Sequence, residues 1–200
     1  MKRIMVFAPH PDDESIGCGG SIVKHAKDGN NITIVFFTSG KEGRETEAKN
    51  AAKILGVSRV EFLRFKDGFL SYSPEAVEKI VKLLEEVKPE FIYVPHEAEG
   101  DLDHQNAFKI VSEVLKKFYH STKPTVLCYE VWTPIQIPNF YEDITDIVEI
   151  KKRAITMHKS QNMLFNFSKA ALSLNAYRGV MSGKGDYCEA FIILKFEGAL

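Results

Sequence analysis

Short apolar segments alternate with helical patterns along most of this chain, and this alternation constrains the fold more than any other feature. We expect strands at 4–7, 32–37, 60–63, 91–94 and 125–131, and helices at 14–27, 45–55, 74–87 and 104–118. The segment 32–37 is a nearly continuous apolar run, which is typical of a strand buried on both faces. The alternation predicts an α/β protein, with a mainly parallel sheet between two layers of helices.

The pattern weakens after Trp132. We expect the segment 132–140, which contains Pro134 and Pro138, to be a surface loop within the same domain. A helix is expected at 147–158 and a late strand at 190–196, with an edge position as one option. Because no linker or internal repeat interrupts the pattern, residues 1–200 are predicted to form a single domain.

The composition restricts the compartment and the partners. Lys and Arg total 26 and Asp and Glu total 27, for a net charge of −1, so no nucleic-acid partner is indicated. The three cysteines are far apart and form no C-x-x-C pair, which fits a reducing, cytoplasmic location. No apolar run is long enough to span a membrane. The oligomeric state stays open, with a homo-oligomer as one option.

A cluster of chemically active side chains follows the first predicted strand. His10, Asp12 and Asp13 lie between that strand and the glycine-rich stretch 17–20. Ligands of open α/β sheets bind at the carboxyl ends of the strands. In a doubly wound sheet of order 3-2-1-4-5, the first and fourth strands are neighbours, so the polar loop 96–103 and His104 should open into the same crevice.

These residue types indicate a catalytic metal site. His10, Asp13 and His104 form a set of two imidazoles and one carboxylate, which leaves a coordination position for water. Asp12 then lies beside the metal as a general base, unless it or Asp13 only caps the helix. Asp103 is a candidate to orient His104. The ligand set fits Zn²⁺, and Fe²⁺ is the alternative.

The same residues resemble a known family. The stretch Ala-Pro-His-Pro-Asp-Asp-Glu at 8–14, the glycines at 17–20 and the pair Asp103-His104 are similar to the LmbE-like, or PIG-L, N-deacetylases. Weaker similar elements occur at 44–57, 65–68, 158–161, 178–179 and 189–191. The resemblance implies a Rossmann-like fold and zinc-dependent removal of acetyl groups from N-acetylglucosamine-type substrates.

The resemblance also implies roles for single residues. It makes His10, Asp13 and His104 the zinc ligands, Asp12 the general base, and Arg44 and Asp67 contacts to the sugar. One position departs from the family: many members have a histidine three residues before the last ligand, where this chain has Asp101. An ionised aspartate donates no hydrogen bond to an oxyanion. His96 and His158 are therefore further candidates for the oxyanion site or its rim.

We thus expect a zinc-dependent hydrolase that deacetylates a small N-acetylglucosamine-type amino-sugar or a conjugate of one. One alternative is a metal-dependent amidase for a non-sugar N-acyl substrate. Another is a Rossmann-type nucleotide-binding module built on the glycines at 17–20. The glycines do not follow the first strand directly, and the second strand runs into Thr38-Ser39-Gly40 without an acidic residue, which disfavours a dinucleotide. A third alternative, an inactive metal-free binding protein, conflicts with the intact ligand residues.

Overall fold

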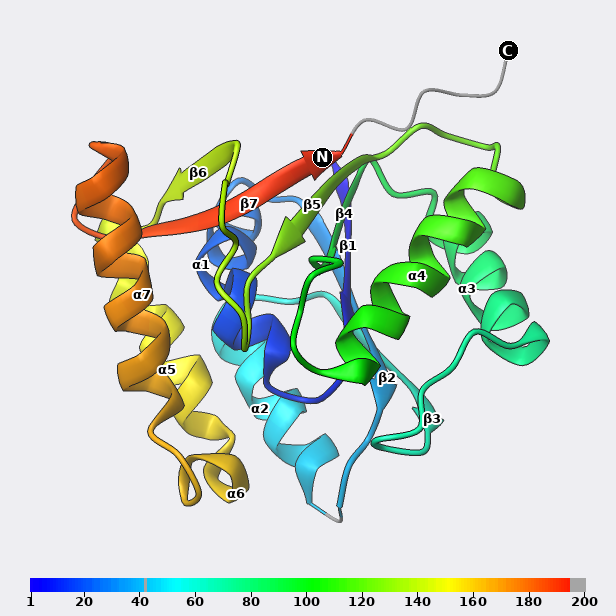
Figure 1. The fold of residues 1–200 in the computed structure, drawn as a ribbon, viewed down its shortest axis with the longest axis horizontal. Coiled ribbons are helices and arrows are strands. Elements are labelled where there is room, and N and C mark those ends of the chain that lie inside the picture. The colour runs from blue at the N-terminus through cyan, green and yellow to red at the C-terminus, as the bar shows by residue number, and fades with distance from the viewer. Residues whose placement is uncertain (42, 195–200) are drawn as a thin grey trace.

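The computed structural model describes residues 1–41 and 43–194, and its centre is a seven-stranded sheet (Figure 1). The strands are β1 (Arg3–Ala8), β2 (Asn31–Thr38), β3 (Arg59–Phe65), β4 (Phe91–Pro95), β5 (Thr125–Tyr129), β6 (Phe140–Asp143) and β7 (Cys188–Leu194). Their order is β3-β2-β1-β4-β5-β7-β6. The first five strands pair in parallel, whereas β7 is antiparallel to both β5 and β6.

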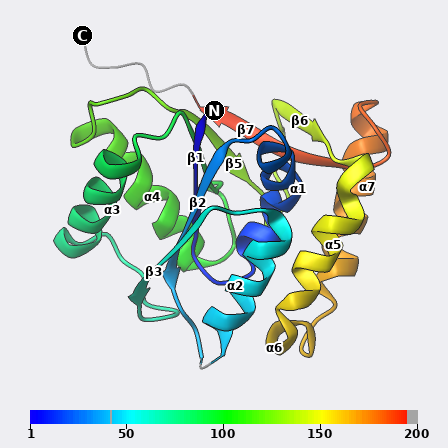
Figure 2. The same ribbon diagram turned by 180° about the vertical axis from the view of Figure 1, so that it is seen from behind.

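Helices cover both faces of the sheet. They are α1 (Asp13–Lys27), α2 (Arg44–Leu55), α3 (Pro74–Val87), α4 (Leu102–Lys117), α5 (Val148–Met157), α6 (Lys159–Asn162) and α7 (Phe167–Ser182), with a 3₁₀ turn at Thr145–Ile147. The helices α3 and α4 pack on one face, and α1, α2 and α5 pack on the other (Figure 2). Within the described ranges, no helix combines the length and the apolar character needed to cross a bilayer.

The predicted fold class and the predicted strand order 3-2-1-4-5 are confirmed. The late strand differs from its prediction: it begins at Cys188 and lies between β5 and β6 instead of at an edge. Its predicted last residues, 195 and 196, lie outside the described residues. The sequence patterns did not predict the edge strand β6 or the helices α6 and α7. The buried face of α7 carries Asn175 and Arg178 while Val180 and Met181 are exposed, so the helix lacks the usual apolar stripe.

The glycine-rich stretch lets α1 pack closely against the sheet. A Cβ atom on Gly17 would lie 2.2 Å from Cδ2 of Tyr129, and one on Gly20 would lie 2.5 Å from Cγ2 of Ile144. Neither contact is sterically allowed, so glycine is required at both positions. Protein atoms therefore occupy the space that a bound phosphate would need, which disfavours the nucleotide-binding alternative.

The helix α1 is broken at Cys18, whose backbone is non-helical (φ −137°, ψ 21°). Beyond this break, the N–H groups of Gly20 and Ser21 donate to the carboxylate of Glu189, over 2.7 and 2.8 Å. The Nζ of Lys151 lies 2.7 Å from the same carboxylate, and both charged side chains are fully buried. One buried ion pair thus joins α1, α5 and β7.

This ion pair leads to a prediction about stability. Lys151→Met should lower the free energy of unfolding by about 3–5 kcal/mol, because it leaves the Glu189 carboxylate buried without its cation. The neighbouring Lys152 is exposed, so Lys152→Met should change stability by no more than about 0.5 kcal/mol. Urea unfolding of the two variants measures the difference. Equal stabilities would show that the pair does not hold the three elements together.

Candidate functional site

The turn after β1 holds Asp12 in a strained backbone conformation. Its φ is 133° and its ψ is −28°, a region that residues other than glycine rarely adopt and that costs on the order of 1–3 kcal/mol. Two hydrogen bonds stabilise the turn. The N–H of Asp12 donates to Oε2 of Glu14 over 3.0 Å, and the N–H of His10 donates to Oδ2 of Asp13 over 2.8 Å.

The turn and the start of α4 bring three potential metal ligands together, as the strand order predicts. The Nδ1 of His10 lies 3.3 Å from Nε2 of His104 and 3.3 Å from Oδ2 of Asp13. The same oxygen of Asp13 lies 3.2 Å from Nε2 of His104. The three atoms form a nearly equilateral triangle, and the three residues are a group able to hold a metal ion.

The spacing within this triangle fits a tetrahedral cation. Ligands at about 2.0–2.1 Å from a tetrahedral ion lie about 3.3 Å from one another. The ring of His10 is oriented for this purpose, because its Nε2 lies 3.1 Å from Asp67 and 3.2 Å from Asp103. A proton on Nε2 bonded to these carboxylates leaves the lone pair of Nδ1 directed at the triangle. Two imidazole nitrogens and one carboxylate oxygen are suitable ligands for zinc.

The predicted orienting residue Asp103 contacts the other histidine. Its carboxylate touches His10, and it accepts the N–H groups of Gly68 and Leu70 over 2.7 and 2.9 Å. Nδ1 of His104 has no hydrogen-bond partner among the described residues, and the nearest carboxylate oxygen, on Glu99, is 3.9 Å away. Asp103 therefore ties His10 to the loop after β3.

The carboxylates make the triangle a favourable place for a positive charge. Burial opposes protonation of His10, but Asp103, Asp13 and Asp67 outweigh it and raise the pKa of His10 to about 12. Burial also opposes ionisation of Asp13, yet the two histidines lower the pKa of this carboxyl group. The pKa of His104 is raised because Asp13 outweighs the burial of the ring. A metal cation bound at the triangle would replace the positive charge of the protons on His10 and His104.

Asp12 lies outside the triangle and differs from Asp13 in its electrostatics. Its side chain is buried, and Oδ1 lies 3.3 Å from a terminal nitrogen of Arg44. Burial and the charge of Asp13 raise the pKa of Asp12 to about 7, against the opposing charge of Arg44. Two adjacent aspartates thus occupy different environments, one directed at the ligand triangle and one beside it.

The two residues expected to contact substrate lie next to these acids. Arg44 is buried, donates to the carbonyl oxygen of Pro11 over 2.7 Å, and lies 3.7 Å from Asp67. Its Nε is buried and has no hydrogen-bond partner among the described residues. The side chain of Asp67 is 46% exposed and forms the solvent side of the cluster.

The three candidates for the oxyanion site or rim have other hydrogen-bond partners. Asp101 caps α4, since its carboxylate accepts the N–H groups of Asp103 and His104. His96 donates from Nε2 to the carbonyl oxygen of Thr133 over 2.7 Å. His158 is buried, and its Nε2 lies 3.4 Å from Glu14, the residue that holds the turn at Asp12.

Two buried glutamates support the site without having been singled out in the sequence. Glu14 belongs to the motif at 8–14. Its position two residues after Asp12 is the sequence feature that indicates a contact with the backbone of the turn. Glu99 accepts the N–H groups of Val131 and Thr133, over 2.7 and 3.1 Å, and that of Trp132 between them. No local pattern indicates this contact, because more than thirty residues separate the partners.

The fold and the site define an α/β protein with a group of residues able to hold a metal ion at the switch point of the sheet and the buried carboxylate of Asp12 beside it. The family model for the GlcNAc-PI de-N-acetylases, PIG-L, matches residues 5–115. The chain belongs to this family, as its sequence motifs indicated. The matched segment contains the triangle, Asp12, Arg44 and Asp67.

Individual relatives agree with this assignment. A diacetylchitobiose deacetylase of Thermococcus kodakarensis is 30% identical, with 80% of this chain and 70% of that protein covered. The structure of the conserved protein TT1542 of Thermus thermophilus has a TM-score of 0.86 at 27% identity and covers 100% of this chain and 97% of its own. The N,N'-diacetylchitobiose deacetylase of Pyrococcus horikoshii has a TM-score of 0.84 at 25% identity, with 97% and 84% covered.

The Glu99 contacts lead to a prediction. Glu99→Ala leaves the N–H groups of 131–133 without their acceptor, so the free energy of unfolding should fall by about 1–3 kcal/mol. The matched control is Glu97→Ala, because Glu97 is exposed two residues away and should tolerate the change. Urea unfolding, followed by the emission of the single tryptophan, Trp132, measures both. An unchanged midpoint for Glu99→Ala would contradict this supporting role.

Proposed function

We propose that this protein is a zinc-dependent N-deacetylase that acts on a small N-acetylglucosamine-type amino-sugar or a conjugate of one. The observation that carries the proposal is the ligand triangle of His10, Asp13 and His104, with sides of 3.2–3.3 Å. The membership of the PIG-L family supports it, as do relatives that are named as deacetylases of N-acetylated sugars.

The metal would be held by Nδ1 of His10, Oδ2 of Asp13 and Nε2 of His104. Zinc bound there would polarise the acetyl carbonyl group and lower the pKa of a water molecule. The donor set favours Zn²⁺, and Fe²⁺ is the alternative to be tested. The protein's own contribution is to keep the three ligand atoms together and to exclude bulk water from His104, which is fully buried.

Asp12 is assigned the proton transfers. One water molecule is consumed: its oxygen forms a bond to the carbonyl carbon while its proton moves to the carboxylate of Asp12. The same proton then passes to the amide nitrogen as the C–N bond breaks. The second proton of the water passes from the carboxylic acid product to the amine, so the products are acetate and the protonated amine. Arg44 orients the carboxylate through the 3.3 Å contact. Glu14 holds the backbone of Asp12, and His158 holds Glu14, so we assign these two residues to positioning.

The sugar side of the substrate is assigned to Arg44 and Asp67. A terminal nitrogen of Arg44 lies 3.7 Å from the exposed carboxylate of Asp67, and the two groups offer a donor and an acceptor, which suits sugar hydroxyl groups. Asp101 and His96 already hold backbone groups, so neither is assigned to the carbonyl oxygen. An amidase for non-sugar N-acyl substrates remains the second candidate, and a panel with N-acetyl amino acids beside N-acetylglucosamine separates the two.

The metal assignment predicts the effect of losing one ligand. His104→Ala should reduce bound zinc from about one equivalent to less than a tenth, because two ligands do not retain the ion. His25→Ala is the control: His25 contacts Tyr93 at the other end of α1 and should leave the zinc content unchanged. Metal analysis by mass spectrometry after dialysis gives the numbers. Full zinc content in His104→Ala would refute the ligand set.

The base assignment predicts a different behaviour. Asp12→Asn should lower kcat for N-acetylglucosamine derivatives by about 10²–10⁴-fold, because the amide does not accept the proton. The zinc content should stay at the wild-type value, since Asp12 is outside the triangle. Asp28→Asn, at the exposed C-cap of α1, is the matched control and should keep full activity. The two measurements together separate loss of the base from loss of the metal.

A further inference from the structure

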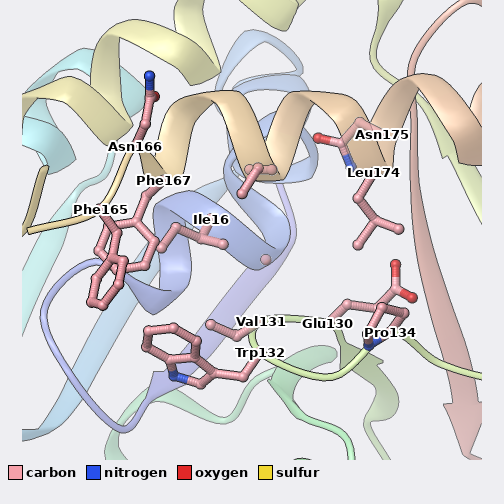
Figure 3. Close-up of a pocket in the computed structure, with 13 residues that line it drawn as sticks. Ile16, Glu130, Val131, Trp132, Pro134, Phe165, Asn166, Phe167, Leu174 and Asn175 are labelled. Atoms are coloured by element: carbon pink, nitrogen blue, oxygen red, sulfur yellow. The ribbon is translucent and has the colours of Figure 1, made fainter.

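An apolar cavity of about 450 Å³ adjoins the catalytic turn on the side of α7 (Figure 3). Ile16 and Gly17 of α1 form one wall, and Val131 and Trp132, which follow β5, form another. Phe165 and Phe167 close one end, where the ring of Phe167 meets the ring of Trp132 edge to face at 5.4 Å. The volume is within the range of small-molecule pockets, about 300–1,000 Å³.

Two walls of this cavity are hydrogen-bonded to residues of the candidate site or close to it. Ile16 lies one helical turn after Asp12, and its N–H donates to the carbonyl oxygen of Asp12 over 3.0 Å. The backbone of Trp132 is held by Glu99, whose carboxylate lies 3.9 Å from Nδ1 of His104. The cavity therefore adjoins the backbone of the turn at Asp12, and its Trp132 wall is held by a carboxylate close to His104.

The cavity and the proposed sugar-binding residues lie on opposite sides of the triangle. Arg44 and Asp67 follow β2 and β3, on one side of β1, whereas Trp132 follows β5 and Phe167 begins α7, on the other side (Figure 1). The carbonyl carbon of an amide has two substituents that diverge, the nitrogen and the acyl chain. If the nitrogen carries a sugar toward Arg44 and Asp67, the acyl chain is directed toward the cavity.

We infer that the cavity binds the acyl part of the substrate, and that the protein removes apolar N-acyl groups longer than acetyl, of about four to six carbons, from an amino-sugar. This inference rests on the proposed function. An acetyl group ends one carbon after the carbonyl and leaves such a cavity empty. The far end of the cavity is closed by Glu130, which is buried and paired with Arg178, so the apolar space is bounded.

The test compares N-acetyl-, N-butanoyl- and N-hexanoylglucosamine by the release of glucosamine. Burial of one methylene is worth about fourfold in binding, so partial burial of the four additional methylenes should raise kcat/KM for N-hexanoylglucosamine at least about tenfold over N-acetylglucosamine. Ala170→Phe fills the cavity from an exposed position and should bring this ratio to about one. Ser173→Phe, exposed on the same helix but outside the cavity wall, should keep the wild-type ratio.

A second measurement needs no turnover. Trp132 is the only tryptophan of the chain, and its side chain is 53% exposed. In metal-chelated protein, N-hexanoylglucosamine should shift its emission to shorter wavelength, whereas N-acetylglucosamine should not. The octyl glycoside of N-acetylglucosamine tests a different occupant of the cavity, an apolar group attached to the sugar. Its kcat/KM should equal that of N-acetylglucosamine, because its octyl chain should not enter the cavity.

The outcomes are distinct. A wild-type enzyme that prefers N-acetylglucosamine, or a gain with the octyl glycoside that Ala170→Phe abolishes, would overturn the acyl assignment and leave the proposed deacetylase intact. If no N-acylglucosamine is hydrolysed by the metal-loaded protein, the proposed function fails. The Trp132 emission then decides separately: a shift with the hexanoyl compound alone supports a site for an apolar chain, and no shift overturns it.

Discussion

The buried carboxylate of Glu189 is the contact on which the arrangement of this molecule depends. It accepts backbone N–H groups from the second part of α1 and is neutralised by Lys151 of α5. Because α1 carries Asp13 in its first turn and Ile16 in its second, the position of this helix determines where the ligand triangle and the cavity lie. The antiparallel strand β7 thus holds α1 in place. The first turn of the same helix carries Asp13 at the end of the parallel strand β1.

The second constraint is local and lies at Asp12. A residue with a side chain is held at φ 133° by hydrogen bonds within the turn, and the cost of this conformation is met by Glu14 and by the packing behind it. The result is that Asp12 and Asp13 point to different places although they are adjacent in sequence. One fully ionised acid and one acid with a raised pKa are what a metal ligand and a proton acceptor need.

Most of the parallel sheet and the ligand triangle could be predicted from sequence, because both follow from local patterns. Each buried strand shows its own apolar run, and the rule that ligands meet at the carboxyl ends of neighbouring strands connects His10 with His104 over more than ninety residues. The helix α7 could not be predicted, since its buried face carries Asn175 and Arg178. The partners of Glu99 and Glu189 could not be found either, because only the tertiary fold brings them together. The sequence predicts that Asp103 orients His104, but Asp103 contacts His10 instead. The reason is that the start of α4 places the Asp103 carboxylate beside the loop after β3.

Most of the cavity wall lies outside the segment that the family model matches, and this has a consequence for how the acyl specificity of such an enzyme changes. The match ends at residue 115, whereas Val131, Trp132, Phe165 and Phe167 all follow it. The proposed metal ligands, the proposed base and the proposed sugar contacts lie within the match, as do Ile16 and Gly17 of the cavity, whereas most of the cavity wall follows it. Glu99 and Glu189 join the two parts of the chain: Glu99 accepts N–H groups from 131–133, and Glu189 accepts N–H groups from Gly20 and Ser21. Under these proposals, substitutions confined to the cavity wall at 165–174 would change the acyl group that is accepted, while Lys151, His158 and Glu189 keep α1 and the turn in place.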